Sequence, residues 1–208
     1  MVSIGKQKDG SSSEAIYRMA LNTIEGEDIS TESILDVGGG AGNFSRRLLE
    51  RGGKDITLLD HDPSIHSHVV NKKECDLNER WPVNKGEYDR VFALEVIEHL
   101  ENPRFFFREI KRALRDGGEA FVTTPHNESL FSRLNFLFTG QHRYFQDSCY
   151  PDHITPVLSV DVERICREQG IKLKDILYSG HSVVPKIGID IYVEGKMFSS
   201  NFGVLVEK

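Results

Sequence analysis

The sequence has few cysteines, no long apolar run and no excess of positive charge, and each absence excludes a class of protein. Its cysteines, Cys75, Cys149 and Cys166, are odd in number and far apart, which disfavours a disulfide framework and is typical of a reducing cytoplasm. No apolar run approaches the ~20 residues that a membrane span requires, and the first residues lack the pattern of a signal peptide. We therefore expect a cytoplasmic protein without a membrane span.

The balance of charge excludes another class of protein. The chain carries 26 Lys and Arg residues against 32 Asp and Glu residues, a formal net charge of −6. Stable binding of nucleic acid usually requires a basic surface, so we expect none here. The 208 residues, of which 38% are hydrophobic, suffice for one domain with its own core. We predict a single domain over residues 1–208, with residues 1–12 disordered.

Predicted strands and helices alternate along the chain, and this alternation predicts the fold class. The expected strands are 33–37, 55–59, 75–77, 88–94, 119–123, 171–178 and 202–206. The expected helices begin at residues 13, 43, 63, 103 and 160. Such alternation produces β-α-β units on a mostly parallel sheet, hence an α/β fold. Ligands of these sheets bind at the carboxyl ends of the strands.

A glycine-rich turn follows the first predicted strand. Residues 38–42 contain four glycines and come directly after the acidic Asp36 and a buried strand. Glycines let the backbone turn tightly and let a ligand lie against the main chain. A dinucleotide site requires G-x-G-x-x-G, and the third glycine is missing here, because Asn43 or Ser45 occupies its position. The remaining pattern is an acidic residue followed by G-x-G-x-G.

Acidic residues also follow the later strands. Asp60 comes at the end of the second strand, Asp76 and Leu77 at the third, and Glu95 at the fourth. An ionised carboxylate can accept two hydrogen bonds at once. Asp60 is therefore a candidate ligand-binding residue.

These motifs, with the string Glu95-Val96-Ile97-Glu98-His99-Leu100, resemble class I S-adenosylmethionine-dependent methyltransferases, especially the small-molecule "EVIEHL" group. The resemblance covers residues 33–125 well and implies a Rossmann-like sandwich of about seven strands, mostly parallel with an antiparallel last strand. It implies S-adenosylmethionine as cofactor and methyl transfer to a small-molecule or a sugar- or lipid-linked acceptor. The implied cofactor-binding residues are Asp36, Gly38, Gly39, Gly40, Asp60, His61, Asp76, Leu77 and Glu95. Among them the resemblance implies that Asp60 holds both ribose hydroxyl groups and that Asp76 and Leu77 contact the adenine edge.

Methyl transfer from a sulfonium mainly requires that the acceptor be aligned with the methyl group. A general base is needed only where the acceptor must lose a proton. Histidines close to strand ends are the candidates, and we predict His99, His126 and His153 as catalytic residues. No role is assigned to His66, His68 and His181.

A metal site is an alternative use of the same string. Glu95, Glu98, His99 and His153 resemble the two glutamates and two histidines that bind a divalent ion in small-RNA 3′-terminal 2′-O-methyltransferases. Such ligands suit Mn²⁺, Zn²⁺ or Fe²⁺ better than Mg²⁺. Glu98 and His99 can also simply open a helix, so we predict no metal. A metal-assisted RNA 2′-O-methyltransferase and a non-catalytic methyltransferase-like partner subunit stay open as alternatives.

An aromatic-rich insertion, residues 127–152, follows the fifth predicted strand. Residues 131–150 hold six aromatic side chains. Because the insertion follows a strand end, it should overhang the ligand side of the sheet as a lid over the acceptor. A dimer contact and an amphipathic helix packed on the core are the alternatives, and we expect a monomer or a homodimer.

Overall fold

The computed structural model describes residues 12–62, 71–179, 182–183, 190–191 and 195–208. The predicted disorder of the first residues, apart from residue 12, lies outside the described residues, as do the helix predicted from Pro63 and the three histidines given no role. None of the described helices is long and apolar enough to cross a membrane. The single domain and the cytoplasmic location stay predictions.

A seven-stranded sheet runs through the centre of the described chain, in the order β3-β2-β1-β4-β5-β9-β6. Its strands are β1 (Ser33–Val37), β2 (Asp55–Asp60), β3 (Asn71–Glu74), β4 (Tyr88–Leu94), β5 (Leu114–Pro125), β6 (Lys172–Tyr178) and β9 (Asn201–Glu207). β1 to β5 pair in parallel, and β9 runs antiparallel to both β5 and β6. The predicted α/β fold with an antiparallel last strand is confirmed. A separate pair, β7 (Ser182–Val183) and β8 (Asp190–Ile191), was not predicted.

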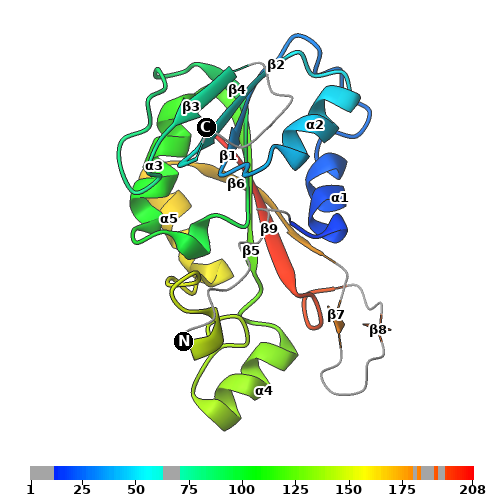
Figure 1. The fold of residues 1–208 in the computed structure, drawn as a ribbon, viewed down its shortest axis with the longest axis vertical. Helices are drawn as coiled ribbons and strands as arrows, with labels where there is room; N and C mark the ends of the chain where they lie inside the picture. The colour runs from blue at the N-terminus through cyan, green and yellow to red at the C-terminus, as the bar shows by residue number, and fades with distance from the viewer. Residues whose placement is uncertain (1–11, 63–70, 180–181, 184–189, 192–194) are drawn as a thin grey trace, which may run out of the picture.

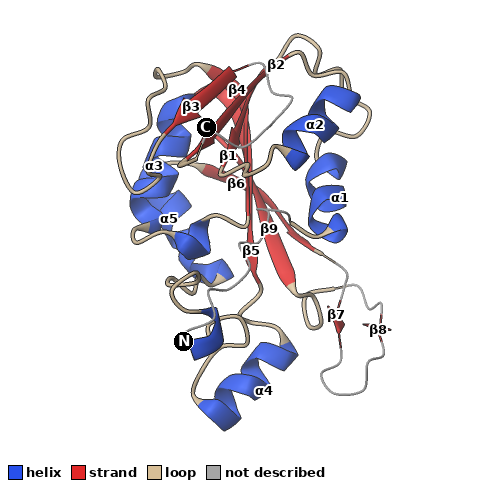
Figure 2. Ribbon diagram, viewed as in Figure 1, coloured by secondary structure: helices blue, strands red, loops and turns tan. Residues whose placement is uncertain are grey.

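Helices cover both faces of the sheet (Figures 1 and 2). α1 (Glu14–Asn22) and α2 (Asn43–Glu50) lie on one face, and α3 (Pro103–Ala113) and α5 (Ser159–Gln169) on the other. Each helix buries an apolar stripe, so that the sheet is enclosed between two apolar clusters, as parallel sheets require. α4 (Leu130–Thr139) lies apart from both layers, beyond the end of β5 (Figure 2).

The third strand is the element that the sequence misplaced. We predicted it at residues 75–77, whereas β3 spans Asn71–Glu74 and pairs with β2. Its side chains are polar and largely exposed, because β3 is an edge strand of the sheet. Charged side chains at an edge discourage pairing with further chains, and they also conceal the strand from a search for apolar residues. The fifth strand likewise begins earlier than predicted, at Leu114, which pairs with Tyr88.

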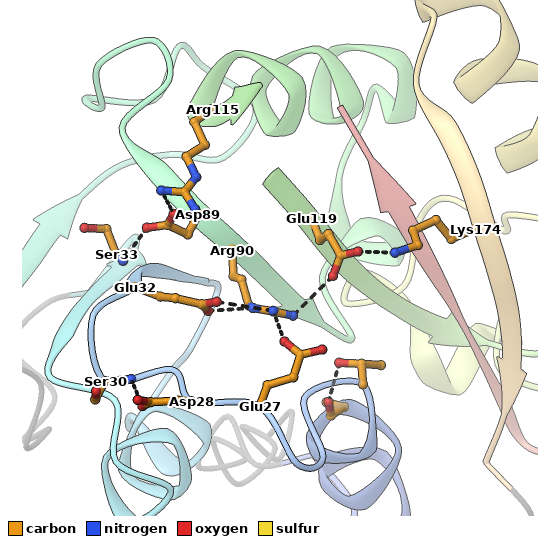
Figure 3. A network of polar contacts seen from close by, with 12 residues as sticks. Glu27, Asp28, Ser30, Glu32, Ser33, Asp89, Arg90, Arg115, Glu119 and Lys174 are labelled. Atoms are coloured by element: carbon orange, nitrogen blue, oxygen red, sulfur yellow. Dashed lines mark hydrogen bonds and ion pairs between the residues drawn. The ribbon is translucent and has the colours of Figure 1, made fainter. Parts of the chain in front are cut away.

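A network of ion pairs joins several elements near the amino ends of the strands (Figure 3). Arg90 of β4 is its centre, with a side chain only 11% exposed. Its guanidinium lies 2.6 Å from Glu32 and 3.2 Å from Glu119, and it also pairs with Glu27. Lys174 of β6 pairs with the same Glu119. The network therefore ties the connection between α1 and β1 to β4, β5 and β6, at the end of the sheet opposite the glycine turn.

Arg90→Met should destabilise the fold by about 2–4 kcal/mol, because partly buried carboxylates would lose the cation that offsets their desolvation. Urea unfolding followed by circular dichroism measures the change. Arg104→Met is the matched control, since Arg104 is 58% exposed and pairs with Glu168, which is itself 56% exposed. It should change stability by less than about 1 kcal/mol. Equal losses in the two variants would contradict a central role for Arg90.

Candidate functional site

The glycine turn after β1 is pressed between β2 and the residues after β4. The Gly38 N–H donates to the Leu59 carbonyl at 2.7 Å. A Cβ at Gly38 would lie 2.5 Å from Val96 Cγ2, and its φ of 65° is in the left-handed region. Gly40 and Gly42 also have positive φ, 53° and 73°. These positions require glycine for backbone conformation and, at Gly38, for space.

The Asp36 side chain packs against the glycine turn. It is only 1% exposed, and the Ser45 hydroxyl of α2 donates to its Oδ2 at 2.5 Å. Burial raises the pKa of Asp36 to about 7, which the hydrogen bond from Ser45 opposes. A Cβ at Gly39 would meet this same carboxylate at 2.7 Å and Leu58 at 2.4 Å. Asp36 thus joins β1 to α2, and its predicted contact with the cofactor stays a prediction.

Asp60 lies at the end of β2 with its carboxylate turned toward the glycine turn. Oδ2 accepts the Gly40 N–H at 2.9 Å, and Oδ1 accepts the Asp62 N–H at 3.1 Å. His61, whose side chain is 84% exposed, has Nδ1 3.0 Å from the same Oδ1. A carboxylate offers about four acceptor positions. The two backbone N–H groups occupy two of them, so Asp60 could accept hydrogen bonds from two ribose hydroxyl groups once the exposed His61 side chain turns away.

The predicted adenine residues follow β3. Asp76 is exposed and its Oδ1 accepts the Asn78 N–H at 2.9 Å, which closes a local turn. Leu77 is buried in the core cluster that also contains Leu59. The structure therefore places both residues beside the end of β2, and their contact with adenine stays a prediction.

Two cavities lie among the described residues of this half of the sheet. A small one lies against the glycine turn, lined by Ser12, Tyr17, Asp36, Gly38, Gly39, Phe44 and Leu94. A larger one, of about 410 Å³, lies at the amino halves of the strands, lined by Ser33, Asp55, Thr57, Asn71, Lys72, Lys73, Glu87 and Tyr88. Its polar groups bond to one another, as in the Ser33–Asp55 and Lys73–Glu87 contacts. Its size alone does not make it the cofactor site, because the glycine turn lies at the other end of the strands.

Glu98, His99 and His153 form a compact cluster after β4. Their ligand atoms all lie within 4.8 Å of one another. His99 Nδ1 lies 2.5 Å from the Asp152 carbonyl and His153 Nδ1 lies 2.7 Å from the Tyr144 carbonyl. A carbonyl only accepts, so both Nδ1 atoms carry the proton, which makes Nε2 the coordinating atom of each ring.

Glu98 supplies the buried side of this cluster. It is fully buried, and the Thr124 hydroxyl donates to its Oε2 at 3.2 Å. Its Oε1 is buried and has no hydrogen-bond partner among the described residues. Burial and the neighbouring charge of Glu95 raise the pKa of Glu98 well above its usual range. A buried acceptor without a partner is costly, so the cluster fits a bound cation, and its carboxylate and imidazoles suit Mn²⁺, Fe²⁺ or Zn²⁺.

Glu95 does not join the cluster. Its carboxylate accepts a hydrogen bond of 2.9 Å from Asn201 Nδ2 on β9, and burial raises its pKa to about 7. Its φ of 58° makes it the one described residue other than glycine with a positive φ. Of the four residues considered as metal ligands, Glu98, His99 and His153 therefore form the cluster and Glu95 does not. Asn201 was missed, because it lies 106 residues from Glu95 and belongs to no motif.

His126 lies in a different environment from His99 and His153. It is fully buried, with its ring centroid 5.2 Å from that of Tyr178 and 5.7 Å from that of Phe202. Burial lowers the pKa of His126 and so favours the neutral ring. This packing does not favour the predicted role of His126 as a base, whereas His99 and His153 do come together.

The aromatic insertion leads from the end of β5 to the cluster. Among its residues, α4 exposes Phe136, Leu137 and Phe138 at 50%, 72% and 80%, and only Ser132 of α4 is buried. The insertion ends where the Ile154 and Thr155 N–H groups donate to the Glu98 carbonyl. The alternative of a helix packed on the core is therefore wrong, while the lid and the dimer contact remain untested.

Comparisons with known proteins establish the family. The profile of a family described as "Methyltransferase domain" matches residues 12–174. The chain belongs to this family. It is an S-adenosylmethionine-dependent class I methyltransferase, as the resemblance of its motifs implied.

Curated relatives of this methyltransferase differ in the acceptor that their names state. "Ubiquinone biosynthesis O-methyltransferase, mitochondrial" of Rattus norvegicus is 28% identical over 139 residues, which cover 61% of this chain and 40% of the relative. "tRNA U34 carboxymethyltransferase" of Campylobacter curvus is 32% identical over 110 residues, covering 48% and 36%. The chain thus spans less than half the length of these relatives.

A solved structure shares the fold over nearly the whole chain. A SAM-dependent methyltransferase from Archaeoglobus fulgidus superposes with a TM-score of 0.66 at 18% identity, covering 92% of this chain and 90% of that one. At this identity the likeness supports the fold and not the acceptor. The methyltransferase family is therefore known, whereas the acceptor must be argued from the site.

Asp60→Ala should weaken the binding of S-adenosylhomocysteine by at least ~1.5 kcal/mol, because hydrogen bonds between a carboxylate and two ribose hydroxyl groups would be lost. Isothermal calorimetry measures the affinity. Asp116→Ala is the control, since this carboxylate is 98% exposed and lies at the start of β5. Unchanged affinity in Asp60→Ala would refute the ribose assignment.

Proposed function

We propose that this methyltransferase methylates a hydroxyl oxygen of a small, largely apolar molecule, with a divalent metal ion held by Glu98, His99 and His153. The observation that carries the proposal is the cluster itself, in which the buried Glu98 Oε1 lacks a partner among the described residues. A hydroxyl group must lose its proton to become a good nucleophile. A bound metal ion would lower the pKa of that hydroxyl group.

The residues of the chain would then have separate roles in the reaction. The glycine turn and Asp60 hold the cofactor, and Asp36 holds the turn. The acceptor oxygen attacks the methyl carbon as the carbon–sulfur bond breaks and its electron pair stays on sulfur. The proton of the hydroxyl group would pass to solvent water on the exposed His99 side of the cluster. Alignment of this kind supplies most of the rate enhancement that a methyl transfer needs, on the order of 7–11 kcal/mol.

The insertion supports an apolar acceptor. Its exposed aromatic side chains lie on the segment between β5 and the cluster, and Tyr144 and Asp152 from that segment orient His153 and His99. A lid that carries both apolar side chains and the carbonyls that orient the cluster would couple acceptor binding to the reacting centre. The sequence led us to predict no metal, whereas the cluster of Glu98, His99 and His153 leads us to propose one.

RNA methylation and a non-catalytic role are less favoured. The net charge of −6 opposes the binding of an RNA backbone, and Glu95 is bonded to Asn201 instead of completing a four-residue metal set. The glycine turn and Asp60 retain the geometry of a cofactor site, which a decayed subunit would have no reason to keep. A small acceptor therefore fits these features best.

Protein purified without chelators should contain a divalent transition metal in stoichiometric amount, measured by elemental analysis. Glu98→Gln and His153→Ala should each lower the affinity for added Mn²⁺ or Zn²⁺ at least about tenfold, because each removes a proposed ligand. His142→Ala is the matched control, a histidine of the same insertion that contacts Ser132 instead of the cluster. Metal-free protein with full activity in EDTA would refute the metal site.

Replacing Phe136 and Phe138 with alanine should lower kcat/KM for the acceptor at least about tenfold, since each aromatic ring that an acceptor covers contributes about 1.5–3 kcal/mol. The best substrate from a panel of phenols and catechols serves as acceptor. The affinity for S-adenosylhomocysteine should stay within a factor of about three. Equal losses of both would contradict a lid, and a change from dimer to monomer on a sizing column would favour the dimer contact.

A further inference from the structure

The pairing of Glu95 with Asn201 has no part in the proposed reaction, yet it is among the most constrained contacts near the site. Glu95 adopts a left-handed backbone conformation, with a φ of 58°, that residues other than glycine avoid. Its N–H donates to the Thr123 hydroxyl at 3.0 Å, which fixes the residue from β5. Strained backbone of this kind persists only where its surroundings enforce it, and it is concentrated at functional sites.

Asn201 is held in position by hydrogen bonds of its backbone to Ser179. Its N–H donates to the Ser179 hydroxyl and its carbonyl accepts the Ser179 N–H, both at 3.1 Å. Its side chain reaches past the end of β5 to donate to Glu95 Oε1 at 2.9 Å. Three neighbouring strands, β4, β5 and β9, therefore fix one carboxylate.

The residues on either side of Glu95 in the chain lie beside the glycine turn. Val96, the next residue, packs so closely on Gly38 that no Cβ fits between them. Leu94, the residue before, lines the small cavity at the turn together with Gly38 and Gly39. Glu95 thus lies where a ligand on the glycine turn meets the end of β4.

We propose that Asn201 is a positioning residue that favours the ionised form of the Glu95 carboxylate beside the cofactor's sulfonium, so that the enzyme binds the charged methyl donor more tightly than its neutral product. An amide N–H can only donate, so it stabilises the ionised form of the carboxylate. The donor carries a positive sulfur, and that charge disappears when the methyl group leaves. The attraction to Glu95, strong in a site shielded from water, disappears with it, which favours product release.

The other acidic groups nearby are engaged differently. Asp36 accepts from Ser45, Asp60 accepts from Gly40, and Glu98 belongs to the proposed metal cluster. Glu95 differs from these carboxylates because its partner, Asn201, comes from β9 at the far end of the sequence. The inference rests on the cofactor site of the proposed function, and not on the acceptor or the metal.

Calorimetry with three probes tests this inference: S-adenosylmethionine, sinefungin, which carries an ammonium group in place of the sulfonium, and S-adenosylhomocysteine. Glu95→Gln and Asn201→Leu should each weaken binding of the two cationic probes about tenfold. The affinity for neutral S-adenosylhomocysteine should change less than about threefold. The double variant should lose no more than Glu95→Gln alone, because Asn201 acts through Glu95.

Ser179→Ala is the matched control, since it removes a hydrogen bond to the Asn201 backbone and leaves the Asn201 amide in place. It should leave the ratio of the affinities for cationic and neutral probes unchanged. If Glu95→Gln weakened the binding of all three probes equally, or left all three affinities unchanged, the inference would be overturned while the cofactor site would stand. Failure of the unmodified protein to bind any of the probes would overturn the cofactor site, and this inference with it.

Discussion

The close contact of the glycine turn with its neighbours is the constraint on which the site depends. The turn lies between the Leu59 carbonyl of β2 and the Val96 side chain after β4, so the carboxyl ends of three strands meet at one backbone. Asp60 bonds the turn from β2, and Asp36 supports it from β1. A side chain at Gly38 would separate these strands, and the groups that they carry would no longer face one ligand.

The proposed acceptor half of the site, around Glu98, is held in place by different contacts. Glu98 is buried, and its Oε1 has no hydrogen-bond partner in the described part of the chain. The residues that bond to Glu98 come from β5 and from the segment directly after the insertion. His99 and His153 are oriented by carbonyl groups of that insertion. The cofactor half is thus fixed by backbone contacts within the sheet, while the acceptor half depends on a segment that the sheet does not enclose.

The sequence predicted the cofactor half well, because its signals are local. The turn at residues 38–42 and the acidic Asp60 each follow a strand whose apolar run is visible, and β1 and β4 were predicted with their observed bounds. β3 was misplaced because an edge strand needs no apolar face. Asn201 could not be predicted, since its contact with Glu95 spans 106 residues and depends on the pairing of β9 with β5.

This difference explains why the family is recognisable while the acceptor is not. A cofactor shared by many enzymes imposes the same backbone turn and carboxylates on each of them, and short motifs record that requirement. An acceptor is bound by side chains at the ends of the strands and in an insertion. The positions of these side chains relative to each other are set only by the completed fold. Glu95 lies at the border of the two halves: its place in the chain belongs to a motif, but the direction of its carboxylate is fixed by a strand from the far end of the sequence.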